Sequence, residues 1–146
     1  MKINIRKVNK NAIIPTKGSR GAAAYDLYAC LDEEYVDISP ESSVFVSTGI
    51  ALAIPEGYWG GIYARSGLAC KQGLRPANCV GVVDADYRGE VIVCLYNDSH
   101  EIKTIYNGDR IAQLIIAPCM DCEFTEVDDL DKTDREAGGF GSTGIN

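Results

Sequence analysis

The sequence predicts an all-β domain built as a sandwich or barrel. Short segments alternate apolar and polar residues with a period of two, which is the spacing of a half-buried strand. Turn-forming residues separate these segments at short intervals, as in Pro55-Glu56-Gly57 and Asn107-Gly108-Asp109. Many short strands at such spacing favour a sandwich or barrel over alternating strands and helices. The predicted strands are Lys2–Arg6, Tyr35–Ile38, Ser43–Ser47, Gly49–Ile54, Tyr58–Ala64, Glu90–Tyr96, Glu101–Tyr106, Arg110–Ala117 and Glu123–Val127.

The remaining segments predict one short helix and a long tail. A helix of one or two turns is expected between Ser66 and Lys71, with Gly73 as its stop signal. The length of 146 residues and the absence of a repeat or linker indicate a single domain over residues 1–146. Residues 128–146 are first acidic and then rich in glycine, so we expect a mobile arm.

The charge balance argues against two classes of partner. The chain has 14 basic and 21 acidic residues, a net charge of −7. Binding to nucleic acid or to an anionic membrane depends on clustered Lys and Arg, so neither partner is expected. No apolar run has the length of a transmembrane helix or the pattern of a signal peptide. Six cysteines scattered through apolar segments are typical of free thiols, which favours the cytoplasm.

The segment Gly81–Gly89 offers the clearest candidate for catalysis. Three apolar residues lead into Asp84, so this carboxylate is expected at the end of a buried strand, where it could hold and deprotonate a water molecule. Asp86 would face the same side of an extended chain, so the pair could instead bind a metal. An Asp-rich turn closed by Gly89 is the alternative without chemistry.

Two further segments contain residues suited to phosphate. Arg65-Ser66-Gly67 places a guanidinium, a hydroxyl and backbone donors where a strand gives way to a helix, although Ser66 could simply cap that helix. Residues 139–144 match G-x-G-x-x-G, but no strand precedes them and the chain ends two residues later, which excludes a dinucleotide fold. Their glycines could still cradle an anion.

Other chemistry is weakly supported. Arg110 and Gln113 lie at the start of a strongly apolar strand, where a buried amide needs a structural partner or a ligand. Cys119 and Cys122 form a lone C-x-x-C pair without further zinc ligands. His100 is the single histidine and lies in a polar turn, so we do not expect it to be catalytic.

Taken together and in this order, five segments resemble the trimeric dUTPase family (deoxyuridine triphosphate nucleotidohydrolases). The resemblance spans residues 22–144. It implies a jelly-roll-like subunit in a homotrimer, with each active site shared between subunits. It also implies hydrolysis of dUTP to dUMP and diphosphate with Mg²⁺ on the triphosphate, which keeps uracil out of DNA and supplies dUMP for thymidylate synthesis. The segments are 22–27, 65–69, 81–89, 108–115 and 138–144.

The resemblance also implies a role for each matching residue. Asp84 would activate the water that attacks the α-phosphorus, and Gln113 would lie near that water. Tyr87 would pack against deoxyribose and exclude a ribose 2′-OH, while Asp26 would hold Mg²⁺ through water. Phe140 would close over uracil as the arm orders. The remaining residues expected to bind substrate are Arg65, Ser66, Gly67, Asn78, Gly81, Val83, Arg135, Gly141 and Ser142.

Three positions depart from the pattern of many relatives. Ala24 and Glu136 each stand where glycine is usual, and Ala64 replaces a common proline. Two other functions are compatible with parts of the pattern. The related dCTP deaminases share the phosphate segments but generally lack a tail like that around Phe140, and some viral relatives resemble regulatory partners.

Overall fold

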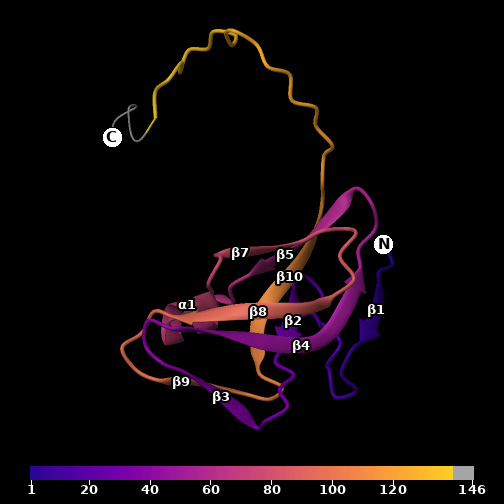
Figure 1. Ribbon diagram of the computed structural model, residues 1–146, viewed down its shortest axis with the longest axis vertical. Coiled ribbons are helices and arrows are strands. Elements are labelled where there is room, and N and C mark those ends of the chain that lie inside the picture. Colours follow the sequence, from indigo (N-terminus) through magenta and orange to yellow (C-terminus); the bar gives the residue numbers. More distant parts are fainter. Residues whose placement is uncertain (140–146) are drawn as a thin grey trace.

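The computed structural model describes residues 1–139, and antiparallel strands dominate this part of the chain (Figure 1). Two four-stranded sheets and one two-stranded sheet are present. The first sheet has the order β1 (Asn4–Lys7), β4 (Ser43–Ala53), β8 (Glu90–Asn97), β6 (Leu74–Pro76). The second has the order β2 (Tyr25–Tyr28), β10 (Arg110–Pro118), β5 (Tyr58–Tyr63), β7 (Val80–Val83), and β3 (Tyr35–Ile38) pairs with β9 (Lys103–Tyr106). The all-β prediction is confirmed.

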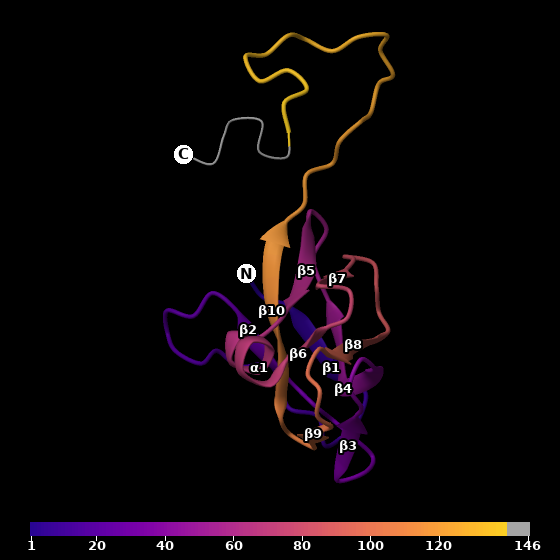
Figure 2. The same cartoon turned by 90° about the vertical axis from the view of Figure 1, so that its left-hand side faces the viewer.

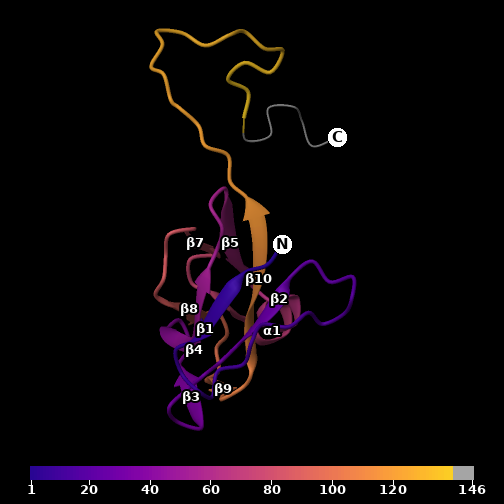
Figure 3. The same ribbon diagram turned by 90° about the vertical axis from the view of Figure 1, so that its right-hand side faces the viewer.

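The core lies between the two larger sheets. In Figure 1 β4 and β8 cross in front of β10, and the turned views place β10 and β2 to one side of β4 and β8 (Figures 2 and 3). On β8, alternate residues are buried, as expected for a strand with one face toward a core. Side chains from both sheets form one apolar cluster, which includes Val46, Leu52, Val91, Val93, Leu95, Leu27, Ile62, Ile111 and Leu114.

A bulge joins two predicted segments into one strand. The sequence predicts separate strands over Ser43–Ser47 and Gly49–Ile54, but both belong to β4, whose pairing with β8 shifts between Ser47 and Ala51. Gly49 lies at this shift with φ of 67°, a left-handed conformation that favours glycine. An added Cβ would also lie 2.7 Å from the Cβ of Ala12, so the close packing requires glycine there.

The short helix is confirmed, and one predicted strand is wrong. Helix α1 (Ser66–Gln72) ends at Gly73, which adopts the left-handed C-cap conformation. Residues Glu123–Val127 form no strand, because no neighbouring strand in the described residues pairs with them. Beyond β10 the chain leaves the sandwich as an extended tail (Figure 1). Among the described residues, no helix is long and apolar enough to span a membrane.

Asn97 is a fully buried polar residue that joins β8 to the smaller sheet. Its side-chain amide donates to the carbonyl oxygens of Ile38 at 2.8 Å and Glu101 at 2.7 Å. Its side-chain oxygen accepts from the backbone N–H of Ser99 at 2.9 Å and from the Ser99 hydroxyl at 2.7 Å. The amide therefore satisfies several buried polar groups that no apolar side chain could satisfy.

We expect Asn97→Ala to lower the free energy of unfolding by about 2–4 kcal/mol, because it leaves buried donors and acceptors unpaired. Asp98→Ala is the matched control, since Asp98 is the next residue and forms only an exposed ion pair with Arg75 at 2.7 Å. Its loss should cost less than about 1 kcal/mol. Urea unfolding at one fixed protein concentration measures both, and equal losses would contradict this role of Asn97.

Candidate active site

The first cluster of predicted site residues lies where β2, β10 and the start of α1 meet. Asp26 on β2 is directly opposite Gln113 on β10, so the two side chains share one face of the sheet. Arg65 follows β5, the other neighbour of β10. The Nε of Arg65 donates to the Oδ1 of Asp26 at 2.9 Å, and the Nη1 of Arg110 donates to Oδ2 at 3.2 Å.

Charge pairing explains how Asp26 can be buried. Its residue exposure is only 9%, and a carboxylate in that position needs partners to offset its lost hydration. The two guanidinium groups supply them, and together they bring two positive charges to one negative charge. The cluster therefore has one excess positive charge at an accessible edge, which suits an anionic ligand.

The beginning of α1 differs from the simplest expectation. Arg65, not Ser66, occupies the N-cap position, and no side chain caps the helix. Ser66 is the first helical residue, so the alternative that it serves as a cap is wrong. An added Cβ at Gly67 would meet nothing within 4 Å, which leaves open space over the backbone of this turn.

The second cluster is the hairpin that contains β7. Gly81 and Val83 are buried on β7, while Val82 points outward. A pocket of about 230 Å³ lies along this hairpin, and it is lined by Ile62, Asn78, Gly81, Val82, Val83, Asp84, Tyr87, Glu90, Val91 and Ile92.

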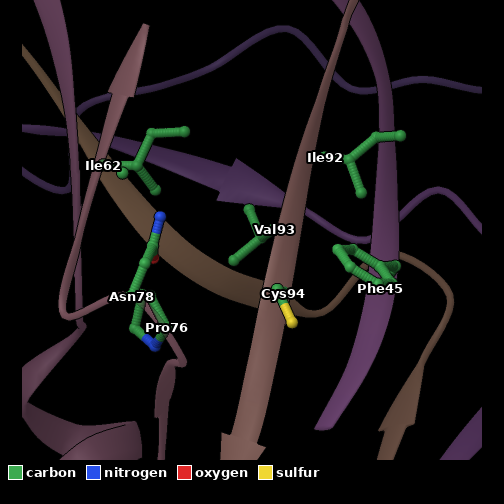
Figure 4. A pocket seen from close by; sticks show the side chains of 8 residues that line it. Phe45, Ile62, Pro76, Asn78, Ile92, Val93 and Cys94 are labelled. Atoms are coloured by element: carbon green, nitrogen blue, oxygen red, sulfur yellow. The ribbon is translucent and has the colours of Figure 1, made fainter.

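A second pocket of about 240 Å³ shares the walls formed by Ile62, Asn78, Gly81 and Ile92. In Figure 4, Asn78 and Ile62 lie on one side of this pocket, and Phe45 and Ile92 lie on the other. The two adjoining pockets give the hairpin a mainly apolar recess, which is the kind of surface on which small molecules bind.

A tight turn places Asp84 beside Tyr87. Asp84 directly follows the last residue of β7, as predicted, but only alternate residues of this strand are buried and Asp84 itself is exposed. The N–H of Tyr87 donates to the carbonyl oxygen of Asp84 at 3.2 Å, which makes residues 84–87 a turn. The chain is therefore not extended here. The metal-binding pair of Asp84 and Asp86, which required an extended chain, is not formed.

The ring of Tyr87 is held in place from two sides. Its hydroxyl donates to the carbonyl oxygen of Glu90 at 3.0 Å. Gly89 lies against the ring, and any Cβ at that position would collide with it. Glycine at position 89 thus allows the Tyr87 ring to line the pocket. Asp84 lines the same pocket.

The two clusters lie at separate places on the second sheet. One row of paired residues crosses the four strands of the second sheet: Asp26, Gln113, Tyr63 and Val80. Three strand spacings separate Asp26 from β7, about 14 Å, and Asp84 lies about 13 Å further along β7. A single chain therefore does not bring Asp84 to the side chains of Asp26, Arg65 and Gln113.

The predicted arm residues divide into two groups. Arg135 lies in the exposed tail, where its Nε donates to the carbonyl oxygen of Gly138 at 2.7 Å. Glu136 has φ of 45°, in the left-handed region that favours glycine, the residue that the family resemblance leads us to expect there. Phe140, Gly141 and Ser142 lie outside the described residues.

Sequence reasoning missed two contributors to these clusters. Arg110 was noted beside Gln113 but was not assigned to the site, and strict strand alternation would place residues 110 and 113 on opposite faces. Glu90 lines the hairpin pocket, and its Oε1 accepts from the N–H of Gly49 at 2.7 Å. Only the pairing between β4 and β8 could have indicated that contact. In the described residues no group of three or more His, Cys, Asp or Glu side chains could hold a metal ion.

A β-sandwich with a cationic cluster and a mainly apolar recess is compatible with the class of proteins that bind phosphorylated ring compounds such as nucleotides. A family model described as dUTPase matches residues 10–144. The chain therefore belongs to the dUTPase family.

Relatives and solved structures agree with this assignment. The chain is 46% identical to the deoxyuridine 5′-triphosphate nucleotidohydrolase of Syntrophotalea carbinolica, over 98% of this chain and 97% of that one. It is 49% identical to the enzyme of that name from Wolinella succinogenes, over 99% and 95%. A mutant dUTPase of Staphylococcus bacteriophage 80alpha with dUpNHpp is similar in structure, with TM-score 0.87, 27% identity and 99% of both chains covered. A mutant dUTPase of phage phi11, described with a structural Mg(II) ion, has TM-score 0.77 and 26% identity over 88% and 98%.

The open space over Gly67 allows a test of whether the cationic cluster around Asp26, Arg65 and Arg110 binds phosphate. We call this group the phosphate cluster. Gly67→Ala should raise the free energy of unfolding by about 0.5–1 kcal/mol, because alanine favours the helix and meets no obstacle. The same methyl group should weaken binding of dUpNHpp roughly tenfold if phosphate approaches this backbone. Calorimetric titration and urea unfolding measure the two effects.

Gly21→Ala is the matched control, since a Cβ there also meets nothing within 4 Å and Gly21 lies in a loop outside both clusters. Its affinity for dUpNHpp should equal that of the unchanged chain. Unaltered affinity in Gly67→Ala would remove Gly67 from the phosphate cluster.

Proposed function

We propose that this chain hydrolyses dUTP to dUMP and diphosphate with Asp84 as the base that activates water. The family assignment and the near full-length similarity to enzymes of this name support the reaction. The position of Asp84 beside the hairpin pocket is the observation that supports its role. Its carboxylate takes a proton from the water, the water oxygen attacks the α-phosphorus, and diphosphate leaves.

The hairpin recess supplies recognition of the base and the sugar. Backbone groups at Gly81 and Val83 and the amide of Asn78 read the edge of uracil. A base with the opposite donor and acceptor pattern would leave these groups unpaired, which disfavours cytosine. The ring of Tyr87, held by Glu90 and Gly89, packs against deoxyribose and leaves no room for a 2′-hydroxyl.

The cationic cluster binds the triphosphate. Arg65, Ser66 and Gly67 supply a guanidinium, a hydroxyl and backbone N–H groups at one turn. Gln113, directly opposite Asp26 on the sheet, supplies an amide near the α-phosphate and the attacking water. All of these groups bind or orient, and the proton transfer belongs to Asp84.

Mg²⁺ is the cofactor that this set of groups fits. Asp26 is the one carboxylate within the cationic cluster, and each of its oxygens accepts a hydrogen bond from an arginine. Mg²⁺ prefers to keep several waters and to bind substrate phosphates with few protein carboxylates. Asp26 would thus hold the ion through water, and the ion would offset charge on the triphosphate.

A complete site requires more than one copy of the chain, and we propose a homotrimer. The separation of Asp84 from the Asp26 cluster by three strand spacings supports a site shared between subunits. Large apolar side chains that are left uncovered support the same assembly, since water-exposed groups of this size favour burial against a partner. They are Phe45, Val82, Met120, Phe124, Val127 and Leu130.

The C-terminal arm, residues 128–146, completes the proposed site. Arg135 would bind the γ-phosphate, Phe140 would cover uracil, and Gly141 and Ser142 would contact phosphate. Arm closure would exclude bulk water from the active site and hold the substrate in position for in-line attack. Removal of dUTP would keep uracil out of DNA and supply dUMP for thymidylate synthesis. The six free cysteines favour the cytoplasm as the place of this reaction.

Asp84→Asn should reduce the rate of diphosphate release from dUTP by about 10²–10⁴, because an amide cannot accept the proton from water. Binding of dUpNHpp should change less than about threefold, since the side chain keeps its shape and its position in the turn. Steady-state diphosphate release and calorimetric titration measure these effects.

Asp86→Asn is the matched control, being another exposed aspartate of the same turn, and it should keep its rate. The unchanged chain should release diphosphate from dUTP but not from dCTP, dTTP or UTP. An undiminished rate in Asp84→Asn would refute its role as base, and tight dUTP binding without turnover would point to a regulatory protein.

A further inference from the structure

A β-bulge places Arg110 on the face of the sheet that contains the phosphate cluster. Arg110 pairs with Tyr28 and Ala112 pairs with Leu27, so β10 has one extra residue, Ile111, at this point. Tyr28 and Asp26 are two residues apart on β2 and therefore share a face. Without the bulge, Arg110 would point toward the core. The strand instead turns Ile111 inward, where it is 0% exposed, and frees Arg110 for Asp26.

The contacts of Asp26 divide between two different arginines. Oδ1 accepts from Arg65 at 2.9 Å, while Oδ2 accepts from Arg110 at 3.2 Å. The Nη1 of Arg65 also donates to the carbonyl oxygen of Arg110 at 3.1 Å, so the backbone of Arg110 helps to orient Arg65. The Arg65 side chain is 23% exposed and that of Arg110 is 50% exposed.

This arrangement poses a problem for phosphate binding by Arg65. If the Nε of Arg65 turns toward a triphosphate, Arg65 gives up its bond to Asp26, whose side chain is only 11% exposed. A carboxylate left so enclosed without a partner is strongly unfavourable, and it would also repel the incoming phosphates. A second cation on the other oxygen removes both penalties.

We propose that Arg110 is the positioning residue of the phosphate cluster: it keeps Asp26 paired so that Arg65 can transfer to the triphosphate. The inference deepens the proposed function and depends on Arg65 as a phosphate ligand. Arg110 acts through Asp26 and Arg65 and does not itself touch the reacting atoms. Its contribution therefore exists only while residue 26 is a carboxylate.

The test measures binding, in EDTA so that Mg²⁺ does not enter. Calorimetric titration with dUpNHpp probes the full phosphate chain, and titration with dUMP probes the base, the sugar and one phosphate. Arg110→Gln should bind dUpNHpp roughly tenfold more weakly and dUMP within about twofold of the unchanged chain. Arg110→Lys retains a cation for Asp26 and should stay within about threefold for dUpNHpp.

A double-mutant cycle separates this role from direct phosphate contact. In an Asp26→Asn background no carboxylate retains Arg65, so adding Arg110→Gln should change dUpNHpp affinity less than about twofold. Arg75→Gln is the control for losing an arginine, because Arg75 pairs with Asp98 on the first sheet, away from this cluster. It should bind both nucleotides normally. Circular dichroism and the elution volume confirm that each variant folds and assembles.

Two results would overturn the inference. If Arg110→Gln costs the same affinity with and without the Asp26→Asn substitution, Arg110 contacts phosphate directly or only supports the fold. Unchanged dUpNHpp affinity in Arg110→Gln would mean that Arg65 needs no such help. Failure of the proposed function is seen separately, as absent diphosphate release from dUTP by the unchanged chain despite dUpNHpp binding.

Discussion

The pairing of β10 with its two neighbours sets the relative positions of the candidate site residues on the second sheet. β10 is hydrogen-bonded to β2 on one side and to β5 on the other, and β5 in turn pairs with β7. This register sets Gln113 against Asp26 and, through Tyr63, aligns both with Val80. A slip of one residue would send each of these side chains to the opposite face. The same register keeps Asp84 away from Asp26, so the geometry of one sheet already separates the proposed general base from the proposed phosphate-binding cluster.

The arginines around Asp26 give the edge of this sheet a positive charge, although the whole chain is acidic. The chain carries a net charge of −7, yet a local excess of arginine surrounds Asp26. Because electrostatic interactions weaken steeply in water and salt, a ligand at the cluster experiences these nearby groups more than the distant acidic surface. An acidic protein can in this way bind a highly anionic substrate. The bulge at Ile111 matters because it adds the second arginine without placing any charge in the core.

Much of the fold could be predicted from the sequence, whereas the roles of the site residues follow from the family resemblance and stay predictions. The long strand β8 buries alternate residues, and its sequence shows the period of two. β2 and β6 were not recognised as strands. β6 has only three residues, and the sequence Tyr-Asp-Leu-Tyr of β2 does not alternate throughout. Glu123–Val127 alternates in the same way as a strand, but the described chain offers it no partner to pair with.

Spatial relations were the part that sequence reasoning could not supply. The turn at residues 84–87 depends on a backbone hydrogen bond, so the side shared by Asp84 and Asp86 in an extended chain does not exist. The extra residue in β10 breaks strict alternation, and Arg110 was seen but not assigned. The turn is local and was one of the alternatives that the sequence left open, whereas the bulge arises from pairing between distant segments and leaves no mark in the periodicity.

The central claim is that the catalytic base and the phosphate cluster of one working site come from different copies of the chain. Its most direct test mixes two variants, Asp84→Asn and Arg65→Gln, unfolds them together, refolds them and measures diphosphate release from dUTP. Each variant alone should be nearly inactive. Random assembly should restore about a quarter of the native sites, because each half is intact with a probability of about one half. A mixture as inactive as its parents, in trimers shown to contain both variants, would contradict the claim.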